Sequence, residues 1–283
     1  LPPLSPSGAA AAPPPIPANP PQHSAERLSV VECFLQQRAP CAAKHLLVLG
    51  TGGSGKTSAL LALHCHLSTT RYTVAARAEG GGRLPVLSVF VPLGKLTDAQ
   101  DVEQLEAAVR TQLGLTKAEA PRVAAACQLV VLLDSLDEAP SATHVESPEW
   151  RPLLDTSEFL REHCRVIVSS RAEHLEKVPG GPARALTATP GDVKTMYVDQ
   201  FTDEDGTALI RNLVQHDEDQ RVRGLRTEDV RDAVKGFGVE EDLLRLPVTL
   251  RMAADLAIHQ AVDPALKAAM QATTSPGAST QWT

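Results

Sequence analysis

The feature that most constrains the fold is a run of eight residues, Gly50-Thr-Gly-Gly-Ser-Gly-Lys-Thr57, which matches the pattern G-x-x-x-x-G-K-[ST]. It follows an apolar run over 45–50 that predicts a short buried strand. It precedes residues 56–68, where leucines recur at helical spacing and predict an amphipathic helix. The pattern binds a polyphosphate when it lies in a glycine-rich loop between a strand and a helix, which is the order predicted here.

Each position of the loop has a chemical reason. Glycines let backbone N–H groups turn inward without a Cβ in the way, and the helix start adds unpaired amides and the positive end of its dipole. Lys56 brings a charge to the β- and γ-phosphates, and the Thr57 hydroxyl is placed to bind Mg²⁺. The alternative is a glycine-rich turn with an incidental lysine. The predicted nucleotide-binding residues of this loop are Gly50, Thr51, Gly52, Gly53, Ser54, Gly55, Lys56, Thr57 and Ser58.

The rest of the chain alternates between strand and helix patterns and then becomes helical. Further strands are predicted at 84–91, 128–134, 165–170 and 196–198, and helices at 25–37, 98–113, 202–214, 227–235 and 247–259. Thr202 and Thr227 are predicted N-caps, and Pro247 suits a first helical turn. Alternating strands and helices imply a parallel sheet covered on both faces, here followed by a small helical domain.

Three carboxylates lie at the end of the third predicted strand, at Asp134, Asp137 and Glu138. The carboxyl ends of parallel strands form the ligand-binding edge of such a sheet. Asp134 is therefore predicted to hold Mg²⁺ through water, and Asp137 or Glu138 to orient the attacking water. The alternative is that acidic residues end a strand and solvate a turn.

An arginine ends the fourth predicted strand, at Arg171. At the same edge of the sheet its side chain can reach a γ-phosphate and distinguish ATP from ADP. An ordinary surface arginine paired with a carboxylate is the alternative that the sequence leaves open.

Together these motifs resemble a NACHT domain, a branch of the STAND class of signalling ATPases, over roughly residues 28–256. The extended acidic motif over 132–138 is the discriminating part, with Ser135 standing where the family usually has glycine. Residues 84–93 resemble the strand that follows the loop in many NACHT domains, and 166–171 resemble the sensor-1 strand. Residues 197–204 resemble the lead into the first helical domain. Residues 243–250 resemble the proline motif near the nucleotide, which makes Pro247 a predicted nucleotide contact.

The resemblance implies an α/β fold: a P-loop NTPase three-layer sandwich with a parallel five-stranded sheet of the additional-strand, AAA-like order, followed by a small helical domain. It implies an ATP- or ADP-binding switch with slow Mg²⁺-dependent hydrolysis that controls conformation and self-association in the ATP state. The family's winged-helix, sensor and effector domains would lie outside this chain, which starts at Leu1 and reads as a fragment.

Composition and short sequence motifs limit the partners, the cellular location and the nucleotide base that the chain is expected to have. The formal net charge of −7 disfavours nucleic acid and anionic membranes as partners, and no apolar run is long enough to predict a membrane span. Five scattered cysteines favour reduced thiols and a cytoplasmic location. No guanine-reading Asn-Lys-x-Asp sequence is found, which favours adenine.

The predicted domain boundaries follow the composition. Nine of the first 21 residues are proline, so residues 1–24 predict a disordered linker, with a ligand for a proline-binding module as the alternative. The nucleotide-binding domain is predicted over 25–200, the helical domain over 201–270 and a disordered tail over 271–283. Two other functions stay open: a multi-turnover P-loop ATPase or kinase, and a scaffold that binds nucleotide without cleaving it.

Overall fold

The computed structural model describes residues 34–35, 43–69, 72–75, 83–98, 100–140, 145, 147, 150–215 and 225–262. The chain divides into two compact units, Leu1–Ala42 and Ala43–Thr283. In the first unit the described residues are Phe34 and Leu35, which are helical. The rest of the helix predicted over 25–37, the linker over 1–24 and the tail over 271–283 lie outside the described residues.

The second unit is built on a six-stranded sheet in the order β2-β3-β4-β5-β1-β6. Neighbouring strands from β3 to β6 are parallel, whereas β2 runs antiparallel to β3 at one edge. The β5 strand therefore lies between β4 and β1, which is the additional-strand order expected for this fold. The strands are β1 (His45–Leu49), β2 (Thr73–Ala75), β3 (Arg83–Pro92), β4 (Gln128–Asp134), β5 (Cys164–Ser170) and β6 (Val193–Tyr197).

Two features of the sheet differ from the prediction. The predicted sheet had five strands, and β2 was missed because three residues are too short to show an alternating pattern. The last strand was predicted over 196–198 but begins at Val193. Its first residues include the polar Lys194 and Thr195, which an edge strand tolerates because only β1 pairs with it.

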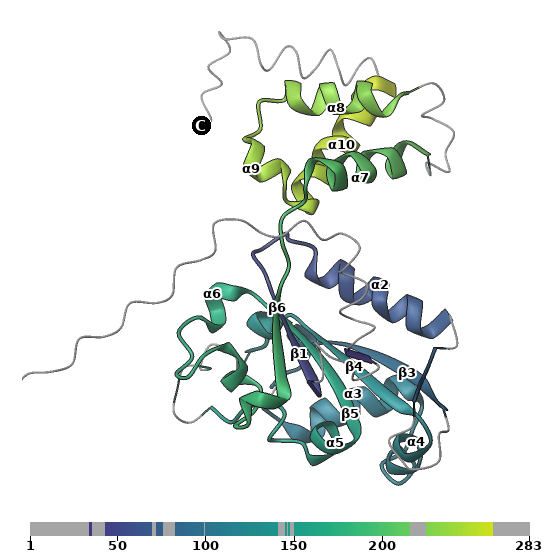
Figure 1. The fold of residues 1–283 in the computed structure, drawn as a ribbon, viewed down its shortest axis with the longest axis vertical. Helices are drawn as coiled ribbons and strands as arrows, with labels where there is room; N and C mark the ends of the chain where they lie inside the picture. The colour runs from purple at the N-terminus through teal and green to yellow at the C-terminus, as the bar shows by residue number, and fades with distance from the viewer. Residues whose placement is uncertain are drawn as a thin grey trace, which may run out of the picture. The chain divides into compact units, whose positions relative to one another are not determined.

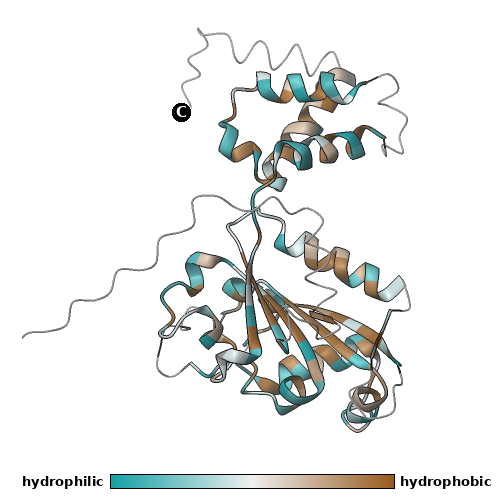
Figure 2. Cartoon of the chain, in the orientation of Figure 1, coloured by the Kyte–Doolittle hydropathy of each residue, from teal (hydrophilic) through white to brown (hydrophobic). Residues whose placement is uncertain are grey.

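Helices cover both faces of the sheet, which gives the three layers of a P-loop NTPase sandwich (Figure 1). On one face lies α2 (Lys56–Thr69), which buries Leu60 and Leu67. On the other lie α3 (Val102–Leu113), α4 (Ala120–Ala126) and α5 (Glu158–His163). The central strands carry apolar runs, over residues 129–133 of β4 and 166–168 of β5, because both of their faces are buried (Figure 2).

Helix ends follow capping chemistry, and this corrects two predicted starts. The helix predicted from 98 begins at Val102, because the Asp101 side chain accepts hydrogen bonds from the amides of Glu103 and Gln104. Thr202 caps the next predicted helix as expected, since its hydroxyl accepts the Asp205 amide at 3.1 Å. Thr227, predicted as an N-cap, is instead the first helical residue of its helix.

Short elements connect the strands to one another. They are the 3₁₀ turns η1 (Leu93–Lys95), η2 (Leu136–Glu138), η4 (Pro182–Ala185) and η5 (Pro190–Asp192), and the one-turn helix α6 (Ala172–Leu175). The sequence pattern missed α4, α5 and α6, because helices of four to seven residues show less than two turns of periodicity.

After β6 the described residues form four helices with their own apolar core. They are α7 (Asp203–Gln215), α8 (Thr227–Gly236), α9 (Glu241–Leu244) and α10 (Pro247–Val262). The core consists of Ile210, Val230, Val234, Leu250, Ala253, Ala254 and Ala257. Among the helices in the described ranges, none has the length and apolar content needed to cross a bilayer.

Candidate functional site

The loop between β1 and α2 depends on glycine at two positions. Gly53 has φ +76° and Gly55 has φ +90°, backbone conformations that residues with a Cβ rarely adopt. A Cβ on Gly53 would also lie 2.5 Å from Cγ1 of Val248, the second residue of α10. The two glycines therefore allow a loop conformation that a residue with a Cβ would strain, and the loop lies against the start of α10.

Lys56 is the first residue of α2, and its ammonium group is held by the loop itself. Its side-chain nitrogen donates to the carbonyl oxygens of Gly50 at 2.7 Å and Thr51 at 2.8 Å. The residue is only 9% exposed, and this burial lowers the pKa of the Lys56 ammonium, while the charge of Asp137 opposes the shift. A phosphate group at the loop would supply the negative charge that this buried cation lacks.

The acidic end of β4 is fixed by a serine of the neighbouring strand. Asp134 is 4% exposed, and the hydroxyl of Ser169 on β5 donates to its Oδ1 at 2.7 Å. The same hydroxyl accepts the backbone N–H of Ser135 at 2.8 Å. Ser135 has φ +59°, the left-handed conformation, which explains why the related motif usually has glycine at this position. One serine thus orients the carboxylate and secures the strained residue beside it.

The other two carboxylates of the motif have different surroundings. Asp137 accepts two hydrogen bonds from Arg171, one from its backbone N–H at 3.0 Å and one from its Nε at 2.9 Å. Glu138 is exposed, and its carboxylate makes no hydrogen bond or ion pair within the described part of the chain. Of the two residues predicted to orient water, Glu138 is therefore the one whose carboxylate is available.

A cavity of about 520 Å³ brings most of the predicted site together. Of the predicted residues, those lining it are Gly52, Gly53, Gly55, Lys56, Thr57, Ser58, Asp137, Glu138, Arg171 and Pro247. Four predicted residues do not line the cavity: Gly50, Thr51, Ser54 and Asp134. They lie behind its lining. The carbonyl oxygens of Gly50 and Thr51 bind Lys56 there, and Asp134 is buried at the end of β4.

Several residues that no sequence motif identifies as site residues also line this cavity. They are Ser135, Phe201, Leu209, Val248 and Arg251. Arg251 lies one helical turn after Pro247 on α10, and this spacing is the signal that would have identified it. It adds a second arginine to the cavity, from an element other than the one that carries Arg171.

The donor set of the cavity fits a magnesium-bound nucleotide. The hydroxyls of Thr57 and Ser58 make no hydrogen bond to other described residues, and the Ser54 hydroxyl is buried without a partner. The volume lies within the usual range for small-ligand sites. The described residues contain no cluster of three His, Cys, Asp or Glu side chains that could bind a metal ion by itself. Mg²⁺ would therefore be bound by phosphate oxygens of the nucleotide together with Thr57 and Asp134.

Comparison with known proteins yields distant structural similarity. No protein-family model matches the chain, and no curated protein matches it. Among solved structures, it is similar to the Aeropyrum pernix ORC2 protein in its ADPNP–ADP complexes, with 13% identity and a TM-score of 0.45 over 83% of this chain and 69% of that one. The Walker-type ATPase PABY2304 of Pyrococcus abyssi aligns at 12% identity and a TM-score of 0.48, over 89% of this chain and 71% of that one.

A third similar structure is the Hsp104–ADP complex of S. cerevisiae, with 12% identity and a TM-score of 0.48 over 87% of this chain and 33% of that one. Because these sequence identities and TM-scores are low, the assignment of the fold rests on this chain's own strand order and loop. Its resemblance to NACHT domains rests on the motifs.

Proposed function

We propose that the chain is a nucleotide-gated switch that binds Mg²⁺-ATP or ADP in the 520 Å³ cavity. The observation that carries the proposal is that Lys56, Thr57, Glu138 and Arg171 line one cavity with the start of α10. Enzymes that bind and hydrolyse a nucleoside triphosphate use these groups: a cation, a hydroxyl, a free carboxylate and an arginine. The lack of a guanine-reading sequence supports adenine over guanine.

The residues have separate roles in this proposal. Lys56 exchanges its bonds to loop carbonyls for the β- and γ-phosphates, and the loop amides surround the phosphate chain. Glu138 accepts a proton from the attacking water or orients it, while Asp137 positions Arg171 toward the γ-phosphate. Thr57 and Asp134 would hold Mg²⁺, which neutralises phosphate charge when bound. Pro247 contributes to the wall of the cavity beside the loop.

Contact between the loop and α10 supports a switch rather than a simple binding site. The Cβ position of Gly53 lies against Val248, and that of Gly55 lies 3.6 Å from Cγ of Pro247. A ligand that orders the loop therefore alters the packing of the residues that begin α10. This is the route by which we propose that the γ-phosphate controls conformation and self-association, as in a NACHT-type switch whose sensor and effector lie elsewhere.

Thermal unfolding of the whole chain with Mg²⁺ and about 1 mM ATP, ADP or GTP tests the binding. A site with a Kd of about 10 μM would be stabilised by about 2.7 kcal/mol at this concentration. ATP and ADP should raise the melting temperature and GTP should not. Lys56→Ala should abolish the shift, whereas Lys95→Ala, which removes an exposed lysine outside the cavity, should keep it. If the Lys56 variant shifts like the parent chain, the assigned cavity is wrong.

Steady-state hydrolysis separates the switch from its two alternatives. A slow ATPase should turn over well below about 1 s⁻¹, the low end for kinases. Glu138→Gln should retain the nucleotide-dependent melting shift and lose the remaining hydrolysis. Turnover above this rate would favour a multi-turnover enzyme, and a parent chain with no measurable hydrolysis would favour a scaffold that only binds.

A further inference from the structure

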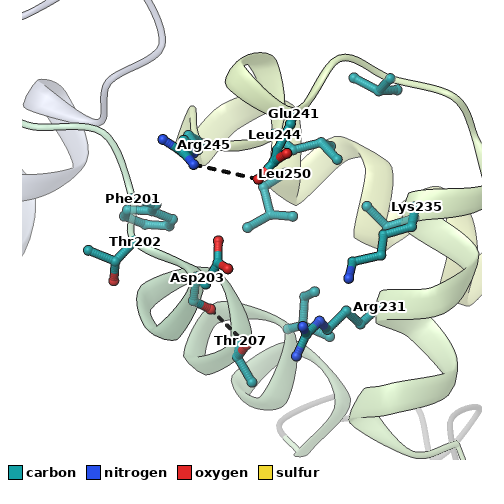
Figure 3. Close-up of a pocket in the computed structure, with 14 residues that line it drawn as sticks. Phe201, Thr202, Asp203, Thr207, Arg231, Lys235, Glu241, Leu244, Arg245 and Leu250 are labelled. Atoms are coloured by element: carbon teal, nitrogen blue, oxygen red, sulfur yellow. Dashed lines mark hydrogen bonds and ion pairs between the residues drawn. The ribbon is translucent and has the colours of Figure 1, made fainter.

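A second cavity, of about 380 Å³, lies within the helical part of the chain (Figure 3). Residues from α7, α8, α9 and α10 line it, together with Phe201 and Val239 from the connecting segments. Ile210, Val234 and Leu250 are buried and supply an apolar floor. The cavity is thus a separate hollow, shaped by the packing of these helices.

Some of the charged residues that line this cavity form ion pairs and others do not. Arg231 and Lys235 stand one helical turn apart on α8, and both side chains reach toward the middle of the cavity (Figure 3). Neither side chain forms a hydrogen bond or an ion pair with any other described residue. By contrast, Arg245 is engaged with Glu241 at 3.5 Å.

We propose that this cavity binds a small organic anion with an apolar body. Its carboxylate or phosphate group pairs with Arg231 and Lys235, and its apolar part lies over Ile210, Val234 and Leu250. Two cations on successive turns of one helix can both contact a single anionic group. Arg231 and Lys235 are exposed, and their side chains make no pair with another described residue, so an incoming anion gains both interactions without breaking a pair among those residues.

The size and shape of the cavity favour a small molecule as its occupant. A volume of about 380 Å³ lies near the lower end of the range for small-ligand sites. A protein partner would need roughly 800 Å² of surface on each side. Asp203 at the start of α7 also lines the cavity, and its carboxylate confines the anionic group to the α8 side.

Isothermal titration of the full chain with octanoate and octyl phosphate tests the proposal. Both probes should bind with a stoichiometry of one, and the tighter probe identifies the preferred anionic group. Acetate, which has the charge without the tail, and octanamide, which has the tail without the charge, should bind at least about tenfold more weakly. Equal binding of octanamide and octanoate would show that the cations have no role and would overturn the proposal.

Substitutions then place the ligand in this cavity. The double variant Arg231→Gln, Lys235→Gln should weaken octanoate binding by at least about tenfold. Arg211→Gln, which removes a cation from α7 outside the cavity, is the matched control and should bind like the parent chain. Asp203→Asn should strengthen binding, because it removes the one carboxylate that lines the cavity without an ion pair in the described residues.

The result is independent of the nucleotide site, because none of the four substituted positions lines the 520 Å³ cavity. Thermal unfolding confirms that each variant is folded before titration. Unchanged octanoate affinity in a folded double variant would place the anion elsewhere and overturn the assignment.

Discussion

Asp137 binds Arg171 at two points, through the backbone N–H at 3.0 Å and through Nε at 2.9 Å. The carboxylate comes from the turn after β4, and the arginine follows β5, so the pair joins the ends of two neighbouring strands. The guanidinium also lies near the loop, since a Cβ on Gly52 would be 3.9 Å from its Cζ. Asp137 thereby fixes where Arg171 meets the phosphate-binding loop.

The first prediction is a measurable coupling between these two residues. A double-mutant cycle with Asp137→Asn and Arg171→Gln should give about 1 kcal/mol in the free energy of unfolding, measured with urea. The value is small because the arginine side chain is 54% exposed and solvent screens its charge. The exposed pair of Arg161 and Glu162 is the control and should show less coupling. A coupling no larger than that of the control would mean that Asp137 does not hold the arginine.

The loop and the strands could be predicted because their information is local in sequence. The spacing of Gly50, Lys56 and Thr57 fixes a backbone shape within eight residues, and continuous apolar runs identify β4 and β5 as buried strands. Asp134, by comparison, was predicted by its position at a strand end. Its bond to Ser169 was not, because 35 residues separate the two and only the register of β4 against β5 brings them together.

The same reasoning explains the remaining gaps in the predicted site. The sequence placed Asp137 and Glu138 in one role, because adjacent carboxylates have the same chemistry until their neighbours are known. The structure separates them, since Arg171 occupies Asp137 alone. Arg251 was missed although it lies one helical turn after Pro247, because this spacing gives a shared helix face and only the packing of α10 shows that the face lines the cavity.

Ser169→Ala and Ser170→Ala form a matched pair for the second prediction. Both serines are buried on β5, but the Ser169 hydroxyl binds Asp134 while the Ser170 hydroxyl has no partner among the described residues. Ser169→Ala should cost about 1–3 kcal/mol of unfolding free energy, because it removes the 2.7 Å donor of a buried carboxylate and leaves only the longer 3.4 Å bond from the Ser135 hydroxyl among the described residues. Ser170→Ala should be neutral or stabilising. Urea unfolding measures both, and equal effects would show that the bond to Asp134 contributes nothing.

A third prediction concerns the backbone of Ser135. Its φ of +59° is costly for a residue with a Cβ, so Ser135→Gly should raise the free energy of unfolding by about 0.5–1 kcal/mol. Gly114→Ala is the reverse experiment, since Gly114 ends α3 with φ +64° and should lose about 1 kcal/mol on gaining a Cβ. A loss of stability in Ser135→Gly would mean that the serine side chain stabilises the turn more than the strain costs.

The fourth prediction is that Cys164 resists alkylation in the folded chain. It is the first residue of β5 and is 1% exposed, and burial raises the pKa of its thiol from 9.0 to about 12. The thiolate is the reactive form, so at pH 8 iodoacetamide should modify the exposed Cys65 and leave Cys164 intact. Peptide mapping after brief labelling distinguishes the two cysteines. Modification of both at similar rates in the folded chain would contradict the buried position of Cys164.

The same shift predicts a dependence of stability on pH. Because the thiol loses its proton more readily in the unfolded chain, it contributes stability that is fully present below about pH 9 and is lost as the pH rises toward 12. Cys164→Ala removes this contribution, so its free energy of unfolding should fall less steeply with pH than that of the parent chain. Urea unfolding between about pH 8 and pH 11 measures the free energy of unfolding of both proteins. Groups that titrate in both contribute equally, so the difference between the two curves reports the Cys164 thiol. Parallel curves would show that the Cys164 thiol ionises equally readily in the folded and unfolded chain.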